Sequence, residues 1–185
     1  MQNKSDTADI LEDYSITVRL GELNVRHDKH FRYALPSASG KAYELIQGFH
    51  GSFSHNREES FYALDFKMPK GDTVCAARDG LVVWSEDHHE EGGKDPSFYN
   101  KANSVIIMHK DGTMALYNHL QKNGGLVEIG QTVKQGQPLG LSGNSGYTTT
   151  PHLHFAIHEN NKSVPIRFKN LPKTLKKNHT YKIRN

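Results

Sequence analysis

The stretch Leu141–His158, which reads LSGNSGYTTTPHLHFAIH, decides how the fold is built. After Pro151 polar and apolar residues alternate, so that the apolar residues at 153, 155 and 157 share one face while His152 and His154 lie on the other. This alternation is typical of a half-buried strand with one face in the core and the other over a cleft. The glycine, serine and threonine residues before Pro151 predict a flexible loop that leads into the strand.

The histidine face of this strand brings candidate chemistry to one place. His152 and His154 are two residues apart, so their backbones lie roughly 6.5 Å apart and their imidazoles can face a common point. His158 lies roughly 13 Å along the strand from His154 and is therefore not expected to join the same site.

Other short segments repeat this period of two between glycine-containing turns. Lys110–Thr113, with Asp111-Gly112 at its centre, is typical of a β-hairpin turn. Strands are predicted over residues 15–20, 31–35, 61–66, 73–77, 81–84, 104–108 and 114–117. Because no long stretch has helical periodicity, we expect a mainly β fold, a small antiparallel sheet, sandwich or barrel.

Length and composition limit the class of protein. A chain of 185 residues is most simply one domain with a substantial core, and no run approaches 18 apolar residues, so no transmembrane segment is expected. The first ten residues are polar, so no signal peptide is expected in this chain. The single Cys75 excludes an internal disulfide and a multi-cysteine metal site, and we expect it to be a small buried residue.

The charge of the chain is small but unevenly distributed. A net charge of +3 does not indicate a nucleic-acid partner. Residues 160–185, however, carry eight Lys/Arg and no Asp/Glu. This basic tail predicts electrostatic contact with anionic envelope polymers, and the alternative is a solvated tail that keeps the protein soluble.

A long insertion, Ser85–Asn103, is expected to line a functional cleft, because loops of this length are uncommon in compact domains. It contains His88 and His89 followed by two glutamates, which would bind a stray metal ion. We expect no dedicated metal site here, since consecutive residues on a mobile loop rarely hold ligands in place.

Four positions elsewhere share one chemistry: His55, Asp65, His119 and the pair His152/His154. A catalytic zinc site uses three nitrogen or oxygen ligands and leaves a fourth position for water, which the metal activates. It also needs a proton acceptor and an oxyanion partner, which histidines supply. This inventory alone is a weak indication, because a chain with twelve histidines places some of them suggestively by chance.

Ordered local motifs are much more specific than the inventory. They run in sequence as Ser54-His55, Tyr62-Ala63-Leu64-Asp65-Phe66, Pro69-x-Gly71, Ala76-Ala77-Arg78-Asp79-Gly80, His109-x-Asp111-Gly112, Tyr117-x-His119-Leu120, Gly130-x-x-Val133-x-x-Gly136, Gly143-Asn144-Ser145-Gly146 and Pro151-His152-Leu153-His154-Phe155. In this order and approximate spacing, over roughly 48–168, they resemble the lysostaphin/LytM-type zinc metallopeptidases.

This resemblance implies a role for each residue. His55, Asp65 and His154 match the three ligands of one zinc ion per chain, while His119 and His152 match the two non-ligand histidines beside the metal. The implied fold is a small antiparallel β-sheet with long loops around a zinc groove. The implied activity is hydrolysis of peptide bonds in bacterial peptidoglycan through a metal-activated water, in the periplasm or outside the cell.

The sequence departs from the family pattern at two places. Nine residues separate His55 from Asp65, where many members have three, and His50 is the rival ligand. The run Thr148–Thr150 replaces the usual Ser-Thr-Gly before the final Pro-His. His109 is expected to be structural or to support the site without contacting the metal.

Two other functions remain open at this point. The first is a non-catalytic module of the same fold that binds or activates cell-wall hydrolases. The second is a histidine phosphocarrier on a similar glycine-rich β sandwich, which would not need Asp65. The predicted organisation is an N-terminal arm with two strands over 1–47, a peptidase domain over 48–168 and a basic tail over 169–185.

Overall fold

The computed structural model describes residues 25–182, so the strand predicted over 15–20 lies outside the described residues. Nearly every regular element is a strand, and the described part holds one turn of 3-10 helix, η1. The elements are β1 (Ala42–Gln47), β2 (Leu64–Lys67), β3 (Thr73–Cys75), β4 (Gly80–Glu86), β5 (Gly92–Gly93), η1 (Pro96–Phe98), β6 (Ser104–Met108), β7 (Met114–Asn118), β8 (Leu120–Gly125), β9 (Thr132–Val133), β10 (Pro138–Ser142), β11 (Gly146–Tyr147), β12 (Leu153–Glu159), β13 (Lys162–Ser163) and β14 (Thr180–Lys182).

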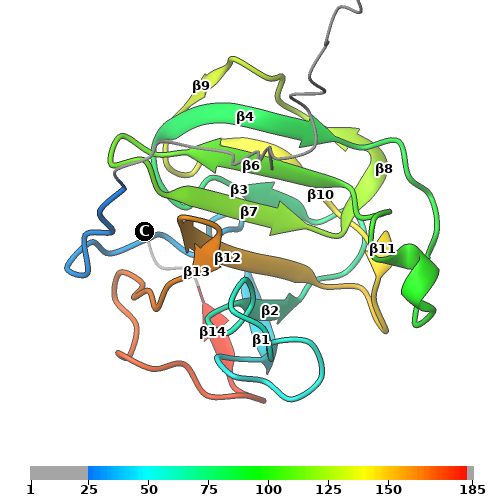
Figure 1. The fold of residues 1–185 in the computed structure, drawn as a ribbon, viewed down its shortest axis with the longest axis horizontal. Helices are drawn as coiled ribbons and strands as arrows, with labels where there is room; N and C mark the ends of the chain where they lie inside the picture. The colour runs from blue at the N-terminus through cyan, green and yellow to red at the C-terminus, as the bar shows by residue number, and fades with distance from the viewer. Residues whose placement is uncertain (1–24, 183–185) are drawn as a thin grey trace, which may run out of the picture.

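The strands form one large sheet and two small ones (Figure 1). The large sheet has nine strands in the order β14-β1-β2-β12-β7-β6-β4-β9, with β13 paired to β12. Its neighbours are antiparallel, as are those of the three-stranded sheet β3-β10-β8. β5, in the long insertion, pairs in parallel with β11, the strand that precedes β12 in the chain.

The central strand β12 organises the core as its alternation predicts. Leu153, Phe155 and Ile157 are each fully buried. They belong to one apolar cluster that also takes in Val74 of β3 and Leu139 of β10, so the small sheet packs over the large one. In Figure 1, β3 and β10 lie behind β6 and β7. The predicted mainly β, antiparallel fold class is confirmed.

The strand predicted over 31–35 is reduced to a single bridge between Tyr33 and Phe168. The reason lies in the backbone hydrogen bonds of this segment. The Tyr33 amide donates to Arg167, whereas the next amide donates to Ala77 in a different part of the chain. A segment that divides its hydrogen bonds between partners cannot extend one ladder.

Of the strands that were not predicted, β1 and β14 form one edge of the large sheet. In β1, the adjacent Leu45 and Ile46 break the simple alternation, and Gln47 is a buried polar residue where a hydrophobic one is expected. β14 lies in the basic tail and pairs with β1. The division into 1–47, 48–168 and 169–185 stays a prediction. Within residues 25–182 no helix has the length and apolar character needed to cross a membrane.

Candidate metal centre

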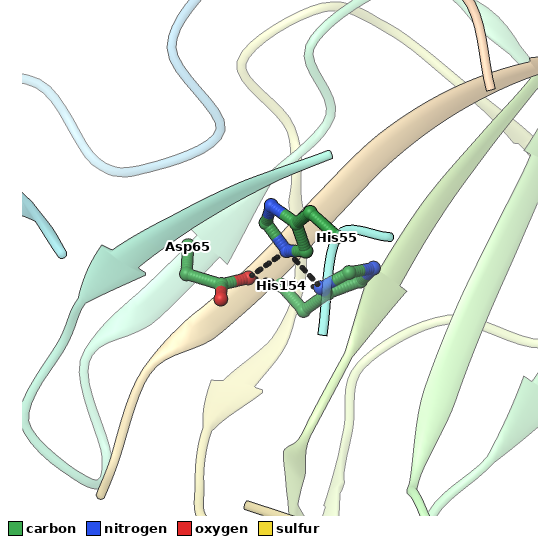
Figure 2. A group of neighbouring side chains, drawn as sticks. All are labelled: His55, Asp65 and His154. Atoms are coloured by element: carbon green, nitrogen blue, oxygen red, sulfur yellow. Dashed lines mark hydrogen bonds and ion pairs between the residues drawn. The ribbon is translucent and has the colours of Figure 1, made fainter. Parts of the chain in front are cut away.

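Three side chains from separate segments converge on one point (Figure 2). His55 comes from the loop between β1 and β2, Asp65 from β2 and His154 from β12. Asp65 Oδ1 lies 2.8 Å from His154 Nδ1 and 3.1 Å from His55 Nε2, and these two nitrogens are 3.4 Å apart. The sequence-predicted trio therefore forms one cluster of ligand atoms.

Strand register explains how Asp65 and His154 meet. They are directly opposed across the antiparallel pair of β2 and β12. Opposed residues on one face of such a pair have Cβ atoms about 5 Å apart, within reach of a shared ion. His55 completes the cluster because its Nδ1 donates a hydrogen bond to the Gly48 carbonyl, 2.8 Å away, which leaves Nε2 with a free lone pair.

The donor set fits a zinc ion. Nitrogen and oxygen ligands sit about 2.0–2.1 Å from zinc, and tetrahedral geometry then puts them roughly 3.3 Å apart. The distances between the donor atoms, 2.8, 3.1 and 3.4 Å, are close to this value. His55 is fully buried and Asp65 is 5% exposed, so these two side chains are shielded from water, whereas His154 is partly exposed.

Electrostatics keep the Asp65 carboxylate ionised. Burial alone would raise its pKa, but the neighbouring imidazoles of His154 and His55 outweigh burial and hold the pKa well below its usual range. Burial alone would lower the pKa of His55, but the Asp65 carboxylate outweighs burial and raises this pKa above its usual value. A buried carboxylate of this kind, surrounded by imidazoles, provides the negative charge that a dication needs.

The second oxygen of Asp65 is held by a residue that sequence reasoning missed. Gln47 Nε2 donates to Asp65 Oδ2 over 2.9 Å and also lies 2.7 Å from Ser54 Oγ. The backbone of Gly51 packs against this side chain, because a Cβ at Gly51 would come within 2.3 Å of Gln47. The only sequence signal was the polar residue itself at the end of an otherwise apolar strand.

His119 and His152 lie beside the cluster with matching tautomers. His119 Nδ1 is 2.7 Å from the Ser145 carbonyl, and His152 Nδ1 is 2.7 Å from the Thr150 carbonyl. A carbonyl oxygen only accepts, so each Nδ1 carries a proton and each neutral ring keeps its Nε2 lone pair. His152 Nε2 lies 3.8 Å from Asp65 Oδ1.

The backbone at His119 adopts an unusual conformation. Its φ of 67° is in the left-handed region, which non-glycine residues adopt rarely and at a cost of about 1–3 kcal/mol. His119 is also the single residue between β7 of the large sheet and β8 of the small one. The chain therefore changes sheets at the residue that faces the cluster.

Burial keeps both of these histidines neutral. Desolvation, with help from the nearby His152 and His154, lowers the pKa of His119 to about 3. Burial also lowers the pKa of His152, against the opposing effect of Asp65. Each ring is thus a proton acceptor at neutral pH.

A groove of about 340 Å³ opens beside the cluster and reaches it at Asp65. It is lined by Asp65, His119 and His152, and by the run Thr148–Thr150. A row of aromatic rings flanks it: Phe53 stacks on Tyr147 with ring centroids 5.8 Å apart, and Tyr147 stacks on Tyr99 with centroids 4.3 Å apart. Phe53 and Tyr99 are more than half exposed, so this apolar row is open to a ligand.

The remaining candidates lie outside the cluster. His50, the rival ligand, is exposed and packs its ring against Phe61 and Tyr62. His109 is buried and its Nδ1 bonds Thr113 Oγ1 at 2.9 Å. Cys75 is a buried free thiol, and burial raises its pKa.

The fold and site define an antiparallel β protein with a cluster of two histidines and one aspartate beside a groove. The sequence profile of Peptidase family M23 matches residues 59–166. Because this match covers more than half of the chain, the protein belongs to peptidase family M23, and the resemblance found in the sequence is confirmed. The matched region contains Asp65, His119, His152 and His154 but begins after His55.

Relatives of known name are similar to this region. The Peptidoglycan DD-endopeptidase ShyA of Vibrio cholerae is 39% identical over 108 residues, which are 58% of this chain and 22% of the relative. The Glycyl-glycine endopeptidase ALE-1 of Staphylococcus capitis is 39% identical over 95 residues, 51% of this chain and 23% of the relative. The chain thus spans less than a quarter of the length of each.

Solved structures agree with the fold. A zinc containing peptidase from Vibrio cholerae superposes with a TM-score of 0.55 at 26% identity, covering 77% of this chain and 41% of that one. The catalytic domain of the prophage-encoded M23 protein EnpA from Enterococcus faecalis has a TM-score of 0.53 at 22% identity, covering 71% of this chain and 94% of that one. The second of these likenesses concerns the fold alone.

Proposed function

We propose that this protein is a zinc-dependent endopeptidase that hydrolyses peptide bonds in bacterial peptidoglycan, in stem peptides or cross-links. The observation that carries the proposal is the convergence of three metal-binding side chains with two neutral histidines in one groove. The names of the relatives ShyA and ALE-1, both endopeptidases, support the same substrate class.

In this proposal one zinc ion per chain is held by His55 Nε2, Asp65 Oδ1 and His154 Nδ1. When bound, zinc supplies an activated water and polarises the carbonyl under attack. Gln47 holds the non-coordinating oxygen of Asp65 and so fixes which oxygen faces the metal. The Gly48 carbonyl accepts the Nδ1 proton of His55 and so fixes the tautomer in which Nε2 is free to bind the metal.

His119 and His152 carry the proton transfers. One Nε2 lone pair accepts the proton of the attacking water, and the resulting imidazolium returns that proton to the leaving amine. The other ring would stabilise the developing oxyanion only with a proton on its Nε2, because its Nδ1 proton is bonded to a backbone carbonyl. The carbonyls of Ser145 and Thr150 keep both rings in place during this exchange.

The groove supplies substrate binding. Phe53 and Tyr147 give an apolar wall for an extended peptide, and Lys67 and Lys177 at the rim attract its carboxylates. Such a substrate implies work in the periplasm or outside the cell. Contact of the basic tail with anionic envelope polymers stays a prediction, tested by comparing sacculus binding of the wild type and a Lys173→Gln/Lys176→Gln variant at low and high salt.

The experiment that tests the function pairs metal analysis with hydrolysis of purified peptidoglycan. We expect one zinc in the proposed centre, release of new amino groups, loss of release after chelation and recovery on adding zinc. Asp65→Asn is the matched control, since it keeps the shape of the side chain without its charge. Zinc without cleavage of any cross-linked sacculus would favour the alternative, a non-catalytic module, and absence of zinc would overturn the proposal.

A further inference from the structure

A second group of metal-binding side chains lies outside the proposed centre. Glu86 ends β4, and His88 and His89 follow it after Asp87 in the long insertion. Glu86 Oε1 lies 3.2 Å from His89 Nε2 and 3.7 Å from His88 Nδ1. One donor atom from each of the three residues lies within 4.8 Å of the others.

The carboxylate of this group has no other strong partner. Glu90 is paired with Lys122 and Glu91 with Lys101. In the described part of the chain, Glu86 forms ion pairs only with the two imidazoles. Two imidazoles and one carboxylate are a donor set suited to zinc and other divalent transition metals.

The backbone that carries these ligands is held on both sides. The Asp87 carbonyl accepts a hydrogen bond from the Asn123 amide at 2.7 Å, and Asp87 Oδ2 accepts from the Gly125 amide at 3.0 Å. Asn103 then brackets His89, donating to its carbonyl at 2.7 Å and accepting from its amide at 2.8 Å. The backbone is therefore held at His89 and at Asp87, the residue between Glu86 and His88.

We propose that Glu86, His88 and His89 form a second divalent metal site, which takes zinc and is distinct from the centre at Asp65. Glu86 Oε1 and His89 Nε2 form its better shielded half, with side chains 23% and 21% exposed. His88 is 69% exposed and closes the site from the solvent side.

The second site is connected to His119 through a chain of hydrogen bonds. Asn103, which brackets His89, also donates its backbone amide to Ser145 Oγ at 3.0 Å. Ser145 in turn accepts the Nδ1 proton of His119 through its carbonyl. Metal at the second site therefore stiffens the scaffold from which His119 is positioned, and acts as a structural ion.

The test counts zinc ions bound per chain and measures their affinity by equilibrium dialysis against zinc alone. A His88→Ala/His89→Ala variant is compared with His30→Ala/His179→Ala, which removes the same number of exposed or partly exposed imidazoles elsewhere. We expect the first variant to bind one ion fewer than the wild type and the second to match the wild type. Glu86→Gln should weaken the same ion by at least about 10-fold.

This test does not depend on whether the proposed centre at Asp65 binds zinc, because it compares the number of ions bound by the two double variants, and both keep that centre unchanged. Equal numbers of ions in both double variants would overturn the second site, whatever the total. A further readout is thermal unfolding, in which zinc should raise the Tm of the control variant more than that of His88→Ala/His89→Ala. An identical rise in Tm in the two double variants would also count against the second site.

Discussion

The rings of His119 and His152 face each other with centroids 4.6 Å apart, and each donates its Nδ1 proton to a backbone carbonyl. Two neutral imidazoles fixed in this way keep two Nε2 lone pairs beside one cluster. Neither ring is a member of the ligand cluster itself. This division between ligands and proton carriers is what the proposed hydrolysis requires.

The first prediction separates turnover from metal binding. His119→Asn and His152→Ala should each lower turnover by roughly 10²–10⁴-fold, because a positioned acid–base group contributes that much. Zinc content should stay at the wild-type level. Asparagine is chosen at 119 because it tolerates the left-handed backbone. Full activity in His152→Ala, measured by release of amino groups from sacculi, would sink the assignment.

The second prediction decides between the two candidate first ligands. His55→Ala should lose the zinc of the proposed centre, since it removes a buried donor whose atoms point at Asp65. His50→Ala is the matched control and should keep that zinc, because His50 is exposed and packs on aromatic rings instead. The measurement is metal content after dialysis, with circular dichroism to verify the fold. The reverse pattern would make His50 the ligand.

The periodicity of residues 153–157 predicts that strand and its histidine face, because alternation fixes which side chains share a side. It did not predict the register that sets Asp65 opposite His154, since pairing between segments so far apart depends on the whole sheet. Nor did it predict Gln47. Gln47 reaches the cluster only because the pairing of β1 with β2 sets it opposite Asp65.

The third prediction concerns Gln47, which acts on the metal through Asp65. Gln47→Met keeps the side-chain length but removes the hydrogen bond to Asp65 Oδ2. Loss of such an outer partner should weaken zinc binding by roughly 10–100-fold. Gln47→Glu is the informative comparison, because it places a second carboxylate beside the first. Zinc affinity measured by chelator competition should fall in Gln47→Met and fall less in Gln47→Glu, because the added negative charge attracts the dication. An unchanged affinity in Gln47→Met would remove Gln47 from the site.

His109 shows that an ordered motif histidine need not serve the site. It is buried near Tyr33 and Thr113, and Arg78 and Asp111 form an ion pair beside it. Burial, reinforced by Arg78 and opposed by Asp111, lowers its pKa to about 3. Burial also lowers the pKa of the neighbouring His27.

The last prediction follows from this depressed pKa. Below pH 6.5 the unfolded chain protonates His109, whereas the folded protein does not until about pH 3, so stability is lost as the pH falls through this window. At pH 5 the loss attributable to His109 is about 2 kcal/mol. His109→Asn should therefore show a shallower decline between pH 7 and pH 5, measured by urea unfolding at each pH. His30→Ala, an exposed control, should decline like the wild type, and the slope left in His109→Asn reflects His27 and the carboxylates. Parallel curves for wild type and His109→Asn would mean that His109 is protonated in the folded protein, and that the Arg78–Asp111 pair tolerates its charge.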